Sequence, residues 1–382
     1  MKIKFCFINI VLIQNFLDLE VSIMSDEEVI LHVENLRAYY PSKDGLIKAV
    51  DDVSFDVKKG ESLGILGESG CGKSSLALAI IGLFDKMARF RAGSSNVPGL
   101  LKEFEKNGEE TPGATGTVIF RGHDMLNTPY EELAKLRGKE IAMIPQGLTH
   151  ALNPQYSIGM QTGEPIEIHD EDVRLIEMKK KVLDFLNLVS LADADTRYVL
   201  DPGSFSGGEA QRVLIAMSLI SGPYLVIADE PTSALDVTIQ RQIMNVLQMV
   251  KDEFDVSTIM ISHDAGVIAE VSDRIAIMYA GKIMELGNAV QIYHSPGHPY
   301  TMGLMASFPT IAMMRMREGG SRPKLRGIRG EPPDPRNIPE GCPFHPRCDF
   351  AKDGCKEKVP EYREVEPGHW IRCIRYEEIQ KE

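Results

Sequence analysis

The sequence has no excess of basic residues. Its 42 lysines and arginines are outnumbered by 55 aspartates and glutamates, which gives a formal net charge of -13 at pH 7. Because nucleic-acid backbones bind to basic surfaces, this balance excludes a typical nucleic-acid-binding protein, and we expect no nucleic-acid partner.

Long apolar runs are missing after the first 24 residues. None approaches the roughly 18 residues that a membrane-spanning helix needs, so we expect a soluble chain. Residues 1–24 open with lysines and an apolar run, but they contain acidic residues and no small-residue cleavage site. We interpret them as a misassigned start or a flexible leader before Met24, with a short amphipathic segment at a membrane surface as the alternative.

A glycine-rich stretch, ESLGILGESGCGKSSLALAIIGL at 61–83, follows the order strand, turn, apolar helix. In such a loop, backbone N–H groups point at phosphates and the helix start adds positive charge, so the stretch predicts a nucleotide site. We assign Lys73 to the β- and γ-phosphates and Ser74 to Mg²⁺. The other expected contacts of ATP in this loop are Gly67, Glu68, Ser69, Gly70, Cys71, Gly72 and Ser75. Cys71 is expected mainly to fill space.

Two carboxylates end a second apolar strand, in YLVIADEPTSALD at 224–236. Ligands of open α/β folds collect at the carboxyl ends of the strands. We expect Asp229 to hold Mg²⁺ through water, and Glu230 to orient and polarise the attacking water. A strand simply capped by acids is the alternative, but it leaves the phosphate loop without a metal partner.

Two further stretches carry polar groups at element ends. FSGGEAQR at 205–212 places a serine and two glycines at a helix start, which is a second anion-binding end. His263 follows the apolar strand STIMI, so its imidazole can donate to a phosphate oxygen at the same sheet edge.

Taken in order, these motifs resemble those of the nucleotide-binding subunit of ABC transporters, over roughly residues 29–290. GESGCGKSS matches the Walker A loop, LVIADE the Walker B strand and FSGGE the signature motif, although Phe205 replaces the usual leucine. The resemblance further assigns Gln146 as the Mg²⁺-sensing glutamine, His263 as the switch histidine and Tyr40 as the aromatic stacked on adenine, with Tyr39 as second choice. Its signature residues are Ser206, Gly207, Gly208 and Glu209, and Asp236 lies in its D-loop.

The resemblance implies a fold and an assembly. The expected fold is the α/β P-loop NTPase of ABC type, with a RecA-like core, an antiparallel β subdomain and a helical subdomain at about 148–210. Two cassettes would face head to tail, so that each signature motif completes the partner's ATP pocket, and hydrolysis would drive attached membrane subunits. The expected domains are a leader at 1–24, the cassette at 25–290 with a loop insertion at about 88–115, and a C-terminal extension at 291–382.

Two stretches resemble the oligopeptide and dipeptide importer branch: HALNPQYSIGMQ at 150–161 and HSPGHPYTMGLMASFP at 294–309. The second is also expected to be a helix packed on the cassette. The branch implies an ATPase coupled to peptide uptake at the cytoplasmic face of the membrane. Its partners would be two permeases, a second ATPase subunit, more often a different chain than a second copy, and indirectly an extracellular peptide-binding protein.

Cysteine is scarce, with six in the chain, yet four lie in the Pro-rich tail at Cys342, Cys348, Cys355 and Cys373. An ATPase works in a reducing compartment, which favours metal ligation over disulfides. Close C-x2-4-C pairs, typical of structural zinc, are absent. The wide spacing and the branch's C-x-F-x-P-R-C motif favour a [4Fe–4S] cluster, with zinc or reduced or disulfide-paired thiols as alternatives. His345 and His369 are expected to be surface or second-layer residues, with replacement of one of the cysteine ligands as the alternative.

Other functions remain open at this point. An importer of nickel or of oligosaccharides would share these motifs, since they do not identify the solute. A soluble cassette protein of translation or DNA repair would usually contain two cassettes or a long coiled coil, which this chain lacks. A non-catalytic regulatory cassette is disfavoured because Lys73, Asp229, Glu230 and His263 are all present.

Overall fold

The computed structural model describes residues 28–42, 45–85, 112–147, 151–170, 172–233, 236–308 and 327–381. The expected leader at 1–24 and most of the expected insertion at about 88–115 lie outside these residues. Strand β4 begins at Gly113, which pairs with Tyr39.

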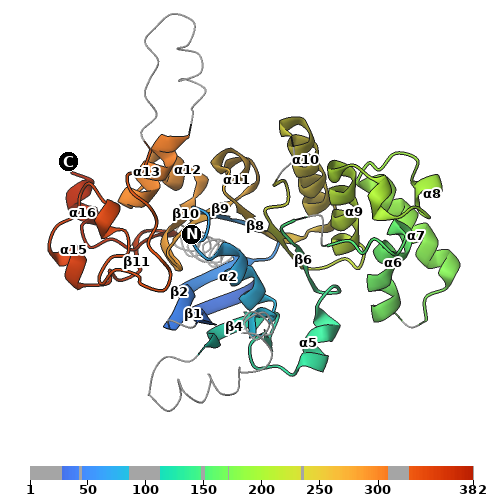
Figure 1. Ribbon diagram of the computed structural model, residues 1–382, viewed down its shortest axis with the longest axis horizontal. Coiled ribbons are helices and arrows are strands. Elements are labelled where there is room, and N and C mark those ends of the chain that lie inside the picture. The colour runs from blue at the N-terminus through green and yellow to red at the C-terminus, as the bar shows by residue number, and fades with distance from the viewer. Residues whose placement is uncertain are drawn as a thin grey trace, which may run out of the picture.

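An eight-stranded sheet in the order β11-β12-β10-β9-β3-β8-β7-β6 forms the centre of the molecule (Figure 1). Its strands are β3 (Ser62–Leu66), β6 (Ile141–Ile144), β7 (Leu225–Asp229), β8 (Ser257–Ser262), β9 (Arg274–Tyr279), β10 (Lys282–Asn288), β11 (Arg363–Glu366) and β12 (His369–Ile371). The run β9-β3-β8-β7-β6 is parallel, and the strands from β10 outward pair antiparallel. Both β3 and β7 are buried along their whole length, which explains their continuous apolar sequences.

A smaller antiparallel sheet has the order β2-β1-β4-β5. Its strands are β1 (Val29–Ser42), β2 (Gly45–Lys58), β4 (Gly113–Phe120) and β5 (His123–Asp124). Buried side chains of this sheet, among them Leu36 and Val53, share one core with Leu76 and Ile80 of helix α2 (Lys73–Ile80). The small sheet is therefore packed against the helix that follows the phosphate loop.

The helices α5 (Tyr130–Leu136), α10 (Val237–Phe254) and α11 (Ala265–Val271) lie between the two ends of the molecule (Figure 1). Another group of helices, consecutive in the chain, gathers at one end, and its last helix packs against α10. This helical group consists of α6 (Ile158–His169), α7 (Leu175–Leu188), α8 (Ala194–Arg197), η2 (Pro202–Ser204) and α9 (Gly207–Leu219). It spans residues 158–219, whereas the helical subdomain was expected at about 148–210. Within the described ranges, none of the helices combines the length and apolar composition needed to cross a membrane.

The C-terminal extension lies at the opposite end from the helical group (Figure 1). It contains α12 (Ala289–His294), α13 (Pro299–Ser307), η4 (His345–Arg347), α15 (Gly354–Glu357), β11, β12 and α16 (Tyr376–Ile379). The extension also adds two short strands to the main sheet. Strand β12 pairs with β10, with Glu285 opposite Ile371 and Leu286 opposite Trp370, so the tail extends the main sheet and shares the core of the cassette.

Candidate functional site

Polar residues follow four neighbouring parallel strands at one edge of the main sheet. The phosphate loop follows β3, His263 follows β8, Asp229 and Glu230 end β7, and Gln146 follows β6. These strands are adjacent in the order β3-β8-β7-β6. Because parallel strands deliver their carboxyl ends to the same edge, residues spread over almost 200 positions of the chain meet there.

The phosphate loop has the geometry that its glycines predict. Gly72 has φ +110°, and a Cβ at this position would collide with the carbonyl oxygen of Ala49. Helix α2 begins directly afterwards at Lys73, whose side chain is buried. Its Nζ donates to the carbonyl oxygens of Gly67 and Glu68 at 2.8 and 3.1 Å. The lysine thus lies inside the curl of the loop.

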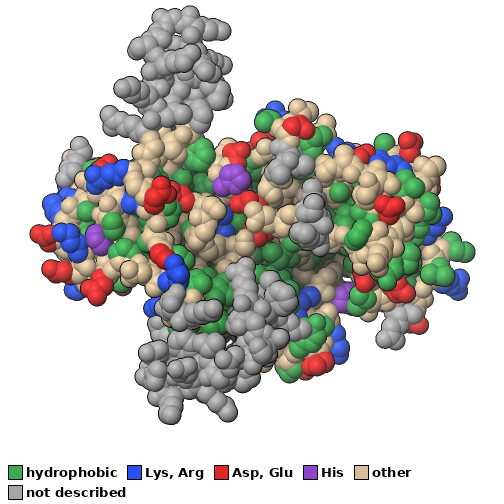
Figure 2. Space-filling model, in the orientation of Figure 1, with side chains coloured by type: hydrophobic (Ala, Val, Ile, Leu, Met, Phe, Trp, Pro, Cys, Tyr) green, Lys and Arg blue, Asp and Glu red, His purple; other side chains and the backbone are tan. Residues whose placement is uncertain are grey.

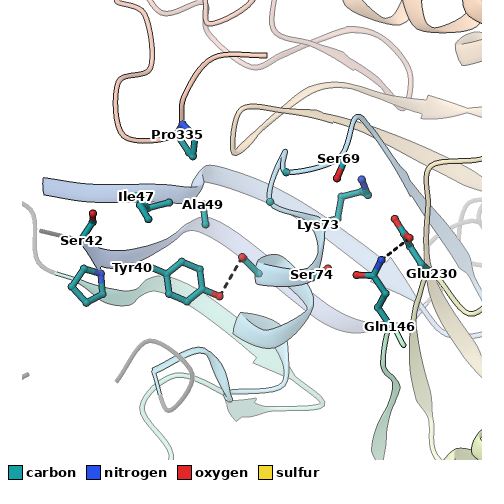
Figure 3. A pocket seen from close by; sticks show the side chains of 14 residues that line it. Tyr40, Ser42, Ile47, Ala49, Ser69, Lys73, Ser74, Gln146, Glu230 and Pro335 are labelled. Carbon is teal, nitrogen blue, oxygen red and sulfur yellow. Dashed lines mark hydrogen bonds between the residues drawn. The ribbon is translucent and has the colours of Figure 1, made fainter. Parts of the chain in front are cut away.

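A cavity of about 570 Å³ opens beside this loop, a size typical of small-molecule sites. Side chains from both sheets and from the extension face it (Figure 3). The lining residues are Tyr40, Pro41, Ser42, Ile47, Ala49, Ser69, Gly70, Gly72, Lys73, Ser74, Ser75, Gln146, Glu230 and Pro335. The cavity therefore joins the expected phosphate and water-activating residues with the expected adenine side.

Asp229 and Ser74 together fit a magnesium ion. Asp229 is 2% exposed, and burial raises the pKa of its carboxyl group, whereas a hydrogen bond with Ser74 lowers it. Its Oδ1 is buried without a hydrogen-bond partner among the described residues. An orphaned carboxylate oxygen beside a serine hydroxyl is a suitable donor set for Mg²⁺.

Glu230 is held from two sides. The Gln146 side-chain amide donates to one carboxylate oxygen at 2.8 Å (Figure 3), and His263 Nδ1 lies 3.2 Å from the other. Its backbone has φ +47°, a strained conformation for a residue with a side chain. The three residues come from the ends of three neighbouring strands, so the sheet itself sets their spacing.

The two tyrosines proposed for adenine stacking are engaged within the chain. Tyr40 lines the cavity, but it is 3% exposed, its ring lies 4.4 Å from that of Phe84, and its hydroxyl is 3.3 Å from Ser75 Oγ. Tyr39 is equally buried and donates to Asp51 at 2.6 Å. Of the two, only Tyr40 lines the cavity.

The signature residues do not line the cavity. Ser206 caps α9 through a capping box with Glu209, which Arg197 contacts at 2.7 Å, and these bonds lower the pKa of Glu209 to about 2. Gly207 and Gly208 form the first turn of α9, and the Cβ of a larger residue at Gly208 would meet Ile239. Asp236 caps α10 by accepting the N–H groups of the next turn. Within one chain these groups belong to helix starts away from the nucleotide cavity.

The extension reaches the phosphate loop, which sequence reasoning missed. Arg347 donates to both carboxylate oxygens of Glu68 at 2.6 and 3.0 Å, and the Glu68 N–H donates to the Tyr300 hydroxyl at 3.1 Å. Pro335 lines the cavity, and its carbonyl oxygen accepts the N–H of Lys48. No spacing in the sequence signals these contacts, because the ion pair joins residues 279 positions apart.

The four tail cysteines are free thiols that lie near one another. Burial, with a smaller contribution from the neighbouring thiols, raises the pKa of Cys342 to about 12 and that of Cys373 to about 11. Burial likewise raises the pKa of Cys348. The backbone N–H groups two residues after these three cysteines hydrogen-bond to the sulfurs, an arrangement that suits thiolate ligands. As they stand, no three His, Cys, Asp or Glu side chains in the described part of the chain form a group that could hold a metal ion.

The expectation for His369 was wrong. It is 2% exposed and lies 2.7 Å from a carboxylate oxygen of the buried Glu285, so it belongs to the core between cassette and extension. His345 is half-buried, with Nδ1 3.0 Å from the carbonyl oxygen of Cys342.

Comparisons with known proteins agree with these features. A family model described as "ABC transporter" matches residues 50–233, and one described as "Oligopeptide/dipeptide transporter, C-terminal region" matches residues 284–355. The oligopeptide transport ATP-binding protein OppD of Haemophilus influenzae is 41% identical over 347 residues, which is 90% of this chain and 96% of that protein. AppF of Bacillus subtilis, with the same description, is 38% identical over 361 residues, or 92% of this chain and 99% of AppF.

Solved structures support the fold. The ATP-binding cassette MJ0796, in a dimeric post-hydrolysis state with ADP and Pi, matches with a TM-score of 0.56 at 23% identity, covering 68% of this chain and 98% of that one. CbiO1 from Clostridium perfringens matches with a TM-score of 0.55 at 23% identity, covering 70% of this chain and 92% of that one. These matches confirm the predicted ABC-type P-loop NTPase fold. Because these relatives align over nearly their whole length at about 40% identity, the chain belongs to the ABC transporter family, in the group of oligopeptide transport ATP-binding proteins.

Proposed function

We propose that this chain is the ATP-hydrolysing subunit of an importer that takes up oligopeptides or dipeptides. The observation that carries the proposal is the meeting of Lys73, Ser74, Asp229, Glu230 and His263 around one sheet edge. The C-terminal match to peptide transporters, and relatives named for oligopeptide transport, support the solute class.

The proposed chemistry is in-line attack of water on the γ-phosphate of ATP. The loop N–H groups and Lys73 bind the phosphates, and Ser74 and Asp229 hold Mg²⁺. When bound, the ion neutralises negative charge on the phosphates. Glu230 orients the water and draws its proton away, while Gln146 and His263 keep that carboxylate at the sheet edge.

The roles of individual residues are tested most directly at the loop. Lys73→Ala removes the positive charge that the loop is proposed to direct at the phosphates, so the ATP affinity of the purified chain should fall at least about tenfold. Unchanged affinity would reject the assignment of the loop. Cells that lack this chain should regain uptake of a radiolabelled oligopeptide when they receive the wild-type gene, but not when they receive the Lys73→Ala gene. If the wild-type gene restores uptake of nickel or of an oligosaccharide instead, the peptide assignment is rejected.

We further infer a partner cassette. Ser206, Gly207, Gly208 and Glu209 do not line this chain's cavity, so their proposed role is to complete the ATP pocket of a second ATPase subunit, with a different chain favoured over a second copy. Asp236 would lie at the same interface.

The proposed docking site for the two permeases is the helical group. Several of its apolar side chains are exposed, among them Met160 at 58%, Leu175 at 76% and Ile176 at 84%. Figure 2 shows mixed acidic and basic side chains over the described part of the face in view. This docking would hold the chain at the cytoplasmic face of the membrane, with an extracellular peptide-binding protein acting on the permeases.

For the tail we propose a [4Fe–4S] cluster bound by Cys342, Cys348, Cys355 and Cys373. The proposal is supported by the electrostatic interaction of these thiols with one another and by the backbone N–H groups at three of the sulfurs. Bound, the cluster would stabilise the fold of the tail. Protein purified without oxygen should contain about four iron and four acid-labile sulfide per chain. One zinc, or no metal at all, would reject the cluster.

A further inference from the structure

The phosphate loop, which is proposed to bind ATP, contains a carboxylate side chain. Glu68 lies between Gly67 and Ser69, and its own carbonyl oxygen accepts a hydrogen bond from Lys73. A negative side chain at this place repels phosphate, because like charges in a partly buried site are weakly screened. A positive charge next to Glu68 offsets this repulsion.

Arg347 supplies that charge from the extension. Its two terminal nitrogens contact the two oxygens of Glu68 at 2.6 and 3.0 Å, the paired geometry in which arginine binds carboxylate most strongly. The Arg347 side chain is 5% exposed and that of Glu68 is 27% exposed. The pair is thus largely shielded from water on the arginine side.

The Arg347 guanidinium is held in place by further contacts within the chain. Its Nε donates to the carbonyl oxygen of Arg329 at 2.9 Å, and Nη1 also contacts the Tyr279 hydroxyl at 3.4 Å. It further lies 6.0 Å from the ring centre of Phe344. In sequence, Arg347 directly precedes Cys348, so the fold of the cysteine-containing tail sets its position.

We propose that Arg347 is a positioning residue of the nucleotide site, which neutralises Glu68 so that the phosphate loop accepts the phosphates of ATP. The inference rests on the proposed ATP site and extends it, because it makes ATP affinity depend on the correctly folded tail. It assigns Arg347 no contact with ATP.

The test compares ATP affinity and steady-state kinetics of full-length variants. Arg347→Met should raise the Kd and KM for Mg·ATP about tenfold, equivalent to about 1.4 kcal/mol, with kcat at saturating ATP little changed. Glu68→Gln should bind ATP more tightly than the wild type, because Arg347 then carries an unpaired positive charge beside the loop. In the double variant the glutamine leaves no charge to neutralise, so affinity should return to within about twofold of the wild type.

Arg372→Met is the matched control. Arg372 is 4% exposed and also joins the extension to a cassette carboxylate, Asp52 at 3.1 Å, but away from the phosphate loop. It should leave ATP affinity unchanged even if it lowers thermal stability.

Three outcomes would overturn the inference. Equal losses of affinity in Arg347→Met and Arg372→Met would show a general effect of tail docking. A loss in Glu68→Gln as large as that in Arg347→Met, or a double variant without recovery, would show that the pair acts as a structural clamp. If Arg347→Met does not fold, Glu68→Gln alone still decides. A wild-type chain that does not bind ATP would instead overturn the proposed function together with this inference.

Discussion

His369 on β12 lies 2.7 Å from a carboxylate oxygen of Glu285 on β10, and both side chains are buried, at 2% and 0% exposed. The same carboxylate accepts the backbone N–H groups of Gly297 and His298 at 2.7 and 2.9 Å. One buried glutamate therefore joins a strand of the cassette to a strand and a helix start of the extension. The tail is part of the cassette core rather than a loosely attached module.

The stability of the whole chain should depend on this glutamate. Glu285→Leu keeps a side chain of similar volume but leaves three buried hydrogen-bond donors without an acceptor. It should therefore lower the free energy of unfolding by about 3 kcal/mol. Urea denaturation measures this loss. The exposed Glu357 offers the control, since Glu357→Leu should change stability by less than about 0.5 kcal/mol. A similar small change in both variants would contradict the role of Glu285.

Stability should also fall in mild acid because of His298. This residue is 1% exposed, its Nδ1 accepts the Tyr300 N–H, and burial lowers its pKa from 6.5 to about 3. The unfolded chain binds a proton at higher pH than the folded chain does. The contribution is therefore complete above pH 6.5 and is lost as the pH falls towards 3, at about 1.4 kcal/mol per pH unit.

His298→Asn isolates this effect, because asparagine keeps a side-chain acceptor at the start of α13 but does not titrate. Denaturation curves between pH 7 and 4 should show a shallower pH dependence in the variant, with the difference growing as the pH falls. Parallel curves for the two proteins would exclude a buried neutral histidine as their cause.

Glu230→Gln should separate ATP binding from hydrolysis. The amide keeps the size of the side chain but cannot take a proton from water, so turnover should fall about 100-fold or more while ATP affinity stays close to that of the wild type. Phosphate release and nucleotide binding measure the two effects. Turnover near the wild-type rate would rule out Glu230 as the residue that activates water.

Ser206→Ala should lower turnover without weakening ATP binding by the isolated chain, because Ser206 lies outside the cavity of its own chain. Loss of the helix cap should cost about 1 kcal/mol of stability. Ser157 caps α6 in the same helical group and provides a matched control. If Ser157→Ala reduces turnover by the same factor, the effect comes from helix stability and not from a contact with the partner's ATP.

The sequence by itself determined the phosphate loop and the strand ends around it. Strand β3 (Ser62–Leu66) precedes the loop and helix α2 begins after it at Lys73, in the order strand, turn and helix that the sequence indicates. Such features are predictable because a turn that needs glycine and a fully buried strand are local requirements, written in consecutive residues.

The local sequence pattern does not specify which partners a side chain contacts, nor does it reveal very short strands. Tyr40 was predicted to stack on adenine; the structure packs its ring on Phe84, directs its hydroxyl to Ser75 and places it in the wall of the cavity. Strands β11 and β12 were not predicted, because they are too short to show an alternating pattern.

Only the tertiary structure decided how the tail meets the nucleotide site. Arg347 and Glu68 are 279 positions apart, and Glu285 and His369 are 84 apart. Each of these residues, taken alone, has the sequence surroundings of an ordinary surface charge. Their pairing depends on the register of β12 against β10 and on the packing of the tail over β9. These arise from the burial of surfaces distant in sequence, which no short stretch of the chain specifies.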